Sequence, residues 1–212
     1  MIYNDHSDLK GKHAVLGASK HAWLSDSDDK LIQRYLNSFA TEIGTATHEY
    51  ACKRIFRRLP MVDHIAEKNA LLLYLLDKDI PWNVIDIDRL FYNLMPYVND
   101  SIGYKMLPEF IVKYSDVSFG TADALVYSRN TLRIHDLKTG TTAADMDQLM
   151  IYAAWFYLEY KKQVNFQKSK TELRIYQNNE VLCHAPTNGE ISGVMERIIR
   201  GSEMIENYIV EV

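Results

Sequence analysis

Residues 120–140, GTADALVYSRNTLRIHDLKTG, contain two carboxylates and a lysine within two short segments of strand-forming residues. Residues 121–127 and 131–138 are rich in β-branched and apolar side chains, which favour β-strands. Residues 128–130, Ser-Arg-Asn, have the composition of a turn. We therefore expect the two segments to form an antiparallel hairpin.

The two acidic residues of this hairpin are expected to meet at its open end. Side chains alternate between the faces of a strand, so Asp136 and Lys138 share a face with the apolar Ile134. Such a strand begins in a core and ends in a polar cleft. In an antiparallel pairing, Asp123 of the first strand lies beside Asp136 of the second.

These charged groups together predict a divalent metal site. Two adjacent carboxylates repel, and the pKa of one of them rises unless a cation lies between them. Oxygen ligands of this kind suit Mg²⁺ or Mn²⁺, so Asp123 and Asp136 are candidate ligands, with the backbone carbonyl of Leu137 as a further one. Lys138 is expected to stabilise the charge that develops on a phosphodiester, or to orient and deprotonate the attacking water.

Gln148 and Tyr152 lie one turn apart on the next predicted helix, which continues the same face with Trp155 and extends to Tyr160. Residues 142–145, Thr-Ala-Ala-Asp, have the form of a capping box that begins this helix. We expect Gln148 to hydrogen bond the attacking water or a phosphate. For Tyr152, contact with the substrate backbone or a base and packing as a core aromatic are equally supported.

An earlier predicted helix, residues 41–59, supplies a candidate nitrogen ligand. His48 shares an inward stripe with Cys52 and Ile55, and beside a carboxylate cleft it becomes a candidate metal ligand. Glu49, which begins a different stripe, is the weaker alternative.

The same helix carries a basic surface. Lys53, Arg54, Arg57 and Arg58 recur at helical spacing. Such a cluster is either a solvated face or a path for a phosphate backbone, and the two interpretations have equal weight. These four residues are therefore candidate substrate-binding residues.

The remaining elements are predicted from periodicity and from turn residues. Residues 20–36 form a helix that Ser19 caps and that residues 25–29 interrupt, and helix breaks are expected near Pro60, Pro81 and Pro96. The other predicted elements are helices over residues 63–77, 86–99 and 190–208, a strand or strand pair over 104–117, and a hairpin of 171–177 with 181–184.

This order predicts an α/β (α+β) fold in which helices flank a mixed central β-sheet. The chain is expected to form one domain over residues 1–212. Its parts are a mainly helical region over 1–100, a sheet core with the active site over 101–185, and a C-terminal helix over 186–212.

Composition excludes several classes of protein. Apolar residues make up 47% of the 212, enough for a full core, and the longest apolar run, residues 70–76, is too short to span a membrane. The first thirteen residues have no secretory h-region. With only Cys52 and Cys183, we expect a cytoplasmic protein without an iron–sulfur cluster. A net charge of −4 argues against a protein that coats nucleic acid.

With these residues in place, the chain resembles the PD-(D/E)XK nuclease superfamily, and within it the RecB-type exonuclease group. That group combines a Gly-x-x-x-His helix, a Gly-x-x-Asp strand, an Asp/Glu-x-Lys strand and a Gln-x-x-x-Tyr helix. The motifs occur here in the same order, as Gly44 with His48, Gly120 with Asp123, Asp136 with Lys138, and Gln148 with Tyr152.

The resemblance implies a restriction-endonuclease-like core that hydrolyses DNA with Mg²⁺ or Mn²⁺, with His48, Asp123 and Asp136 as ligands and Lys138 as the catalytic lysine. Glu109 is a weak further candidate, because some relatives carry an acid there. The group includes phage recombination exonucleases and iron–sulfur CRISPR-associated exonucleases, and the two cysteines here do not suffice for such a cluster.

Related phage systems use ring-shaped oligomers or a single-strand annealing protein, so DNA and a recombination protein are the expected partners. A DNA exonuclease is the leading hypothesis. A catalytically inactive nucleic-acid- or partner-binding protein of the same fold and a structure-specific endonuclease are the alternatives.

Overall fold

A computed structural model of the protein describes residue 5 and residues 14–211, with side chains through residue 209. In this part of the chain the strands form one five-stranded sheet in the order β1-β2-β3-β4-β5. β3 and β4 are parallel, and the other neighbours are antiparallel. The strands are β1 (Leu107–Ser115), β2 (Ser118–Ser128), β3 (Thr131–Leu137), β4 (Lys170–Gln177) and β5 (Glu180–His184).

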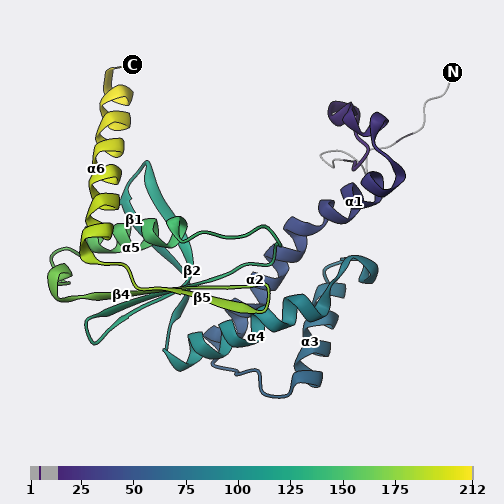
Figure 1. Cartoon of the computed structure of the whole chain (residues 1–212), viewed down its shortest axis with the longest axis horizontal. Coiled ribbons are helices and arrows are strands. Elements are labelled where there is room, and N and C mark those ends of the chain that lie inside the picture. Colours follow the sequence, from purple (N-terminus) through teal and green to yellow (C-terminus); the bar gives the residue numbers. More distant parts are fainter. Residues whose placement is uncertain (1–4, 6–13, 212) are drawn as a thin grey trace.

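Helices cover both faces of the sheet (Figure 1). α2 (Ala40–Phe56) and α4 (Ile87–Gly103) pack against one face, and α3 (His64–Leu76) packs against these two helices. The other face carries α5 (Asp147–Glu159), which makes the crossover between the parallel strands, and α6 (Asn188–Glu211) packs on α5. The predicted α/β fold, with N-terminal helices and a mixed sheet between flanking helices, is confirmed.

The buried side chains form two clusters, one on each face of the sheet. The first includes Ile55 of α2 and Leu94 of α4, and the second includes Ile134 of β3 and Leu149 of α5. Because β3 contributes to both clusters, its two faces are fixed by packing. Residues that follow the buried part of β3 are therefore held in a defined direction.

The predicted hairpin is confirmed by the pairing of β2 with β3. Ser128 pairs with Thr131 across the turn, and the ladder continues to Ala124 and His135. The next position in this register places Asp123 opposite Asp136.

The capping box predicted at Thr142 is wrong, because α5 begins only at Asp147, with Met146 as its N-cap. Gln177, at the end of β4, holds the preceding loop in another conformation. Its amide nitrogen donates to the carbonyls of Gly140 (2.9 Å) and Thr142 (2.8 Å), and its amide oxygen accepts from the Ala144 N–H (3.1 Å). These contacts hold the loop in an irregular, bent conformation where the box would have begun a helix.

The break predicted near Pro96 is also wrong, since α4 continues through Pro96 to Gly103. A proline within a helix removes one hydrogen bond and costs about 3 kcal/mol. Leu94, Tyr97 and Val98 are all buried around it, and this burial offsets the cost.

The N-terminal helix is interrupted as predicted. η2 (Ala18–Ser25) ends at the first residue of the predicted 25–29 interruption, and α1 (Asp28–Ser38) begins within it, with Asp28 and Asp29 in its first turn. Ser19 is not the cap: the N-cap position of η2 is occupied by Gly17, and no side chain caps this helix. Figure 1 shows these two helices extending away from the sheet.

Two short helices complete the fold, η3 (Trp82–Val84) and η4 (Phe166–Lys168). None of the helices in the described part of the chain combines the length and hydropathy that crossing a bilayer requires. The prediction that no secretory segment is present concerns residues 1–13, and 1–4 and 6–13 lie outside the described residues.

Candidate metal centre

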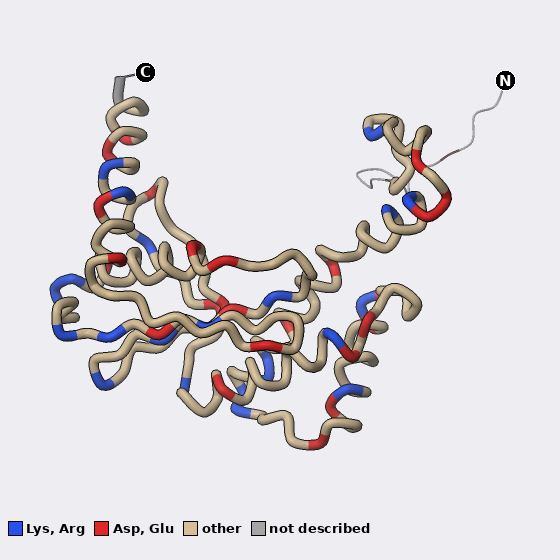
Figure 2. The backbone as a smooth tube through the Cα atoms, viewed as in Figure 1, with Lys and Arg blue, Asp and Glu red and all other residues tan. Residues whose placement is uncertain are grey.

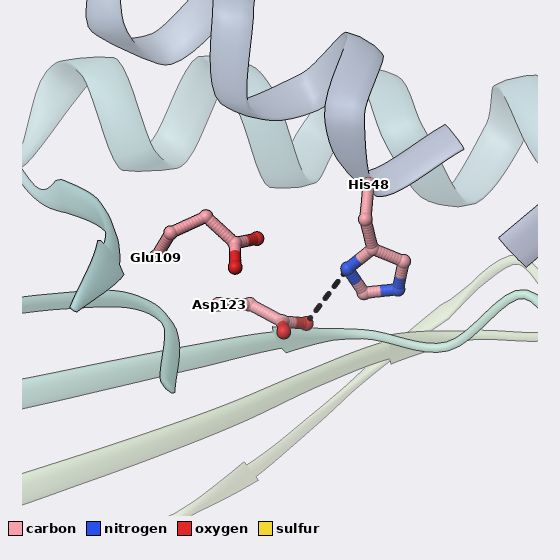
Figure 3. A group of neighbouring side chains, drawn as sticks. All are labelled: His48, Glu109 and Asp123. Atoms are coloured by element: carbon pink, nitrogen blue, oxygen red, sulfur yellow. Dashed lines mark ion pairs between the residues drawn. The ribbon is translucent and has the colours of Figure 1, made fainter. Parts of the chain in front are cut away.

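His48 of α2, Glu109 of β1 and Asp123 of β2 come together on one side of the sheet (Figure 3). Each offers one ligand atom, and these atoms all lie within 4.8 Å of one another. His48 Nδ1 is 3.4 Å from Asp123 Oδ2. One imidazole nitrogen and two carboxylates form a donor set that suits a divalent cation.

The pairing of β1 with β2 explains how Glu109 reaches this group. Pro108 pairs with Ala124 and Phe110 with Ala122, which places Glu109 opposite Asp123. Glu109 has a φ of 51°, in the left-handed region. For a residue with a side chain this conformation costs about 1–3 kcal/mol, and such strain concentrates at functional sites. The glutamate thus occupies a strained turn of the backbone within a strand.

Asp123 is fixed at the point where β2 and β3 separate. Its Oδ2 accepts a hydrogen bond of 2.8 Å from the backbone N–H of Leu137. The registers of the two ladders put Glu109, Asp123 and Asp136 in one row across three neighbouring strands. The sequence predicted that Asp123 lies beside Asp136 and named Glu109 as a weak further candidate, and the structure places Glu109 in the same row.

Asp136 is a buried carboxylate with only 3% of its surface exposed. Lys138 Nζ lies 3.1 Å from its Oδ1 and 2.9 Å from its Oδ2, yet Oδ2 is buried and makes no hydrogen bond with any described residue. Burial and then the charge of Asp123 raise the pKa of Asp136 to about 6. A buried acidic oxygen in this condition fits a place beside a bound cation.

Two other members of the cluster also hold protons more tightly than usual. Burial and the charge of Asp123 raise the pKa of Glu109. Burial lowers the pKa of His48, but its hydrogen bond to Asp123 and the charges of Asp123 and Asp136 outweigh burial and raise it. The charge of Asp123 contributes to all three shifts, and a divalent cation bound beside it would offset that contribution.

A chain of hydrogen bonds connects Lys138 to α5. Its Nζ donates to Gln148 Oε1 (2.7 Å), and Gln148 Nε2 donates to Tyr152 Oη (3.0 Å). Lys138 is therefore held from both sides, by Asp136 and by Gln148. The downstream Gln and Tyr meet the lysine of the hairpin, although ten residues separate Gln148 from it in sequence.

The two motif glycines lie where helices approach strands. A Cβ on Gly120 would be 2.8 Å from the Trp155 ring and 3.1 Å from the Tyr152 ring. A Cβ on Gly44 would be 3.2 Å from Thr139 Oγ1. Gly120 lets α5 approach β2, and Gly44 lets α2 approach the end of β3.

A cleft of about 740 Å³ opens beside the cluster. α2 forms one wall and the strand ends form the other. The lining residues are Ala40, Thr41, Gly44, Thr45, His48, Glu49, Cys52, Lys53, Glu109, Asp123 and Thr139.

The predicted basic residues of α2 do not share one environment. Arg54 donates to the carbonyls of Leu59 (3.0 Å) and Pro60 (2.9 Å) and pairs with Glu67 at 2.6 Å, so it joins α2 to α3. Arg57 and Arg58 are exposed where α2 ends.

Lys53 lines the cleft in a network with Glu49. Lys53 Nζ lies 3.3 Å from Glu49 and donates to Tyr74 Oη at 2.9 Å. Bonds from Lys78, Tyr74 and Lys53 lower the pKa of Glu49 to about 2. Glu49 is thus already neutralised by cations.

Arg89 and Asn93, to which no sequence pattern pointed, hold the loop after β3. Arg89 donates to the carbonyl of Thr139, and Asn93 donates to that of Lys138 (3.3 Å). Asn93 Oδ1 also accepts from the Asn179 N–H (2.8 Å). These contacts join segments distant in sequence, so no local pattern reveals them.

Residues 109–180 match the model of a family described as "Protein of unknown function (DUF2800)". The match covers about a third of the chain. It includes Glu109, Asp123, Asp136 and Lys138, and α2 with His48 lies outside it. No curated protein and no solved structure matches the chain.

Proposed function

We propose that the protein is a metal-dependent deoxyribonuclease of the PD-(D/E)XK type and that it acts as a DNA exonuclease. The observation that carries the proposal is the convergence of His48, Glu109 and Asp123 ligand atoms within 4.8 Å at one end of the Asp136–Lys138 strand. Each side chain comes from a different element, and the chain places all of them at one cleft.

The order along the chain of the elements that carry the motifs supports the same proposal. His48, Asp123, Asp136 with Lys138, and Gln148 with Tyr152 lie on α2, β2, the end of β3 and α5. This is the order of the RecB-type exonuclease group that the sequence resembles. Hydrogen bonds connect Tyr152 through Gln148 to Lys138. The Gln-x-x-x-Tyr helix thereby orients the lysine of the Asp-x-Lys strand.

His48, Glu109, Asp123 and Asp136 would hold the cation, with the Leu137 carbonyl as a further candidate. A bound Mg²⁺ or Mn²⁺ lowers the pKa of a coordinated water and polarises the phosphate. Lys138 presents its ammonium group to the charge that develops on the phosphodiester. Lys53, Arg57 and Arg58 are proposed to contact the DNA backbone. Arg54 has most of its donors engaged by α3 and the loop before it.

The direct test is hydrolysis of end-labelled linear DNA in Mg²⁺ or Mn²⁺ by the wild-type protein and by Lys138→Ala. We expect cleavage by the former and none by the latter, with unchanged circular dichroism. DNA binding without cleavage in any metal would favour the inactive binding protein. Closed circular DNA separates the remaining alternative, since an end-dependent enzyme leaves circles intact.

A second test addresses the metal centre without activity. Titration of the protein with Mn²⁺ in a calorimeter should show binding that Asp123→Asn and Glu109→Gln each weaken. Glu49→Gln is the matched control, because Glu49 lines the same cleft but is neutralised by Lys78 and Lys53. Equal affinity in all four proteins would contradict the proposed ligands.

A further inference from the structure

Six exposed cationic side chains gather at the end of the sheet that lies away from the cleft. They come from the end of α4, the β2–β3 turn and the connection from α5 to β4. Figure 2 shows blue segments along this connection and at the turn. We call this surface the basic end; it comprises Lys105, Arg129, Lys161, Lys162, Lys168 and Lys170.

None of the six forms an ion pair with any residue that the structure describes. Cations elsewhere are commonly neutralised by an adjacent acid, as Lys53 is by Glu49 and Lys138 by Asp136. Residues 161–170, KKQVNFQKSK, contain four lysines and no acid. In a chain of net charge −4 this is a local excess of positive charge.

Strand pairing and hydrogen bonds fix the backbone that carries part of the basic end. Lys170 pairs with Thr131 in the parallel ladder, and its N–H donates to the Asn130 carbonyl at 2.8 Å, which brings it next to the Arg129 turn. Ser169 Oγ lies 2.9 Å from Tyr127 Oη, which ties the connection to β2. The cations are thus presented by backbone that the sheet fixes.

Two pockets lie beside the β2–β3 turn and the connection from α5 to β4. One, of about 540 Å³, is lined in part by Lys161 and Lys162. The other, of about 680 Å³, is lined in part by Lys105, Arg129 and Arg133. Arg133 is already paired with Glu172 at 2.7 Å, so the unpaired charge in this pocket comes from Lys105 and Arg129.

The distance between the basic end and the metal centre sets how long a DNA strand must be to contact both. β3 runs from Thr131, beside the basic end, to Leu137, beside the carboxylates. Six residue steps of about 3.3 Å in a strand give a separation of about 20 Å. Helices cover both faces of the sheet, so DNA that reaches both places must pass around them. About six nucleotides at roughly 3.4 Å each is therefore the shortest single strand that can reach from one to the other.

We propose that the basic end binds the phosphate backbone of the DNA substrate at least about six nucleotides from the scissile phosphate. The proposal rests on the proposed nuclease function and adds to it a requirement for substrate length. The acid-rich cleft would repel a polyanion unless a cation neutralises it, and the basic end supplies attraction at the other end of the same sheet. Lysine contacts with phosphates do not select sequence.

The test neutralises four lysines together, in the variant Lys161→Gln/Lys162→Gln/Lys168→Gln/Lys170→Gln. A matched control changes the net charge equally at other exposed cations without an ion pair to a described residue, in Lys20→Gln/Lys30→Gln/Arg197→Gln/Arg200→Gln. Binding of a fluorescein-labelled single-stranded 30-mer is measured by anisotropy in Ca²⁺ over a range of NaCl concentrations. Cleavage of a 30-mer and of a 4-mer is measured in Mn²⁺.

We expect the slope of log Kd against log salt to become shallower by about 3 in the basic-end variant, from four contacts at about 0.7 each. Cleavage of the 30-mer should fall at least tenfold. Cleavage of the 4-mer, which is too short to reach, should stay within twofold of wild type. The control variant should match wild type in all three measurements.

Equal salt slopes in the variant and the control would overturn the basic end as a DNA surface, while cleavage by the wild type would leave the nuclease proposal standing. A wild-type protein that cleaves neither oligonucleotide overturns the nuclease proposal. The binding titration then decides separately whether the basic end holds DNA.

Discussion

Asp136 and His135 are neighbours on β3 that face opposite sides of the sheet, and burial shifts both toward the neutral form. His135 is fully buried, and burial followed by the charges of Arg174 and Arg133 lowers its pKa to about 3. Asp136 is almost as buried, and its pKa is raised to about 6. The two shifts have the same leading cause, yet the surroundings differ.

His135 belongs to a network of hydrogen bonds and an ion pair that joins β3, β4 and α4. Its Nδ1 lies 3.2 Å from Tyr176 Oη, which donates to Asp100 at 2.7 Å, and Asp100 also pairs with Arg174 at 2.7 Å. Its ring packs edge-on against Tyr104. Asp136 instead lies in a row with two other acids beside a lysine. A perturbed pKa therefore indicates burial on both faces, and only the convergence of ligand groups distinguishes the candidate site.

The largest difference between the two faces should come from Asp136→Asn. The amide has the same shape but removes a metal-binding charge, so we expect DNA cleavage to fall by on the order of 10³-fold. The metal-free protein should melt at the same temperature or higher at neutral pH, because the raised pKa of Asp136 means that the folded protein disfavours its charged form. Nuclease assays and calorimetry check the two effects. A fall in melting temperature along with activity would assign Asp136 a structural role like that of His135.

Gly120→Ala tests whether the site depends on the approach of α5. The new Cβ would lie 2.8 Å from the Trp155 ring, so α5 must shift and carry Tyr152 and Gln148 away from Lys138. A displacement of about 1 Å can cost up to about 10²-fold in rate, and we expect a loss of 10- to 100-fold. Gly140→Ala is the control, since a Cβ there meets nothing within 4 Å. Equal activity in both variants would contradict this account.

The pH dependence of stability should have opposite signs for the two neighbours. Asp136 has a folded pKa of about 6 against an ordinary 3.8, so the metal-free protein loses stability as pH rises through that interval. His135 has a folded pKa of about 3 against 6.5, so stability is lost as pH falls below 6.5. Melting curves from pH 4 to 8 should show a weaker first trend in Asp136→Asn, since the raised pKa values of Glu109 and His48 act in the same direction. They should lose the second trend in His135→Phe. A variant whose trend is unchanged would show that another group causes it.

The smallest effect on activity is expected for His135→Phe. The phenyl ring keeps the packing against Tyr104 and removes a buried Nε2 that has no hydrogen-bond partner among the described residues. The bond to Tyr176 is lost, at a cost of about 1 kcal/mol. Cleavage should stay within about threefold of wild type. A loss as large as that of Asp136→Asn would mean that the two faces are not separate.

Local patterns predicted the parts of the site that lie on one hairpin. Strand alternation and a turn sequence were enough to place Asp123 beside Asp136, because both depend on neighbours in the chain. From the sequence Glu109 is only a weak candidate, because its direction depends on a left-handed backbone conformation that a glutamate within a strand does not indicate. The capping box at Thr142 failed because Gln177, distant in sequence, binds that loop.

The cationic surfaces show the same limit. From the sequence, the candidate substrate-binding cations lie within residues 53–58, where four of them occur close together in the chain. The basic end is assembled from segments between residues 105 and 170 that only the fold brings together. Periodicity describes one helix at a time, so it cannot reveal a surface made by a turn, a helix end and a crossover.

The left-handed residue at Glu109 also affects how the protein behaves at high concentration. β1 is one of the two outer strands of the sheet formed by the described residues, and such strands offer unpaired N–H and C=O groups to other chains. The turn of the backbone at Glu109 and the register shift between Lys113 and Ser115 divide that row into short lengths. A strand from another molecule would find no continuous ladder to extend. The conformation that directs an acid into the cleft thereby also protects the protein against edge-to-edge aggregation.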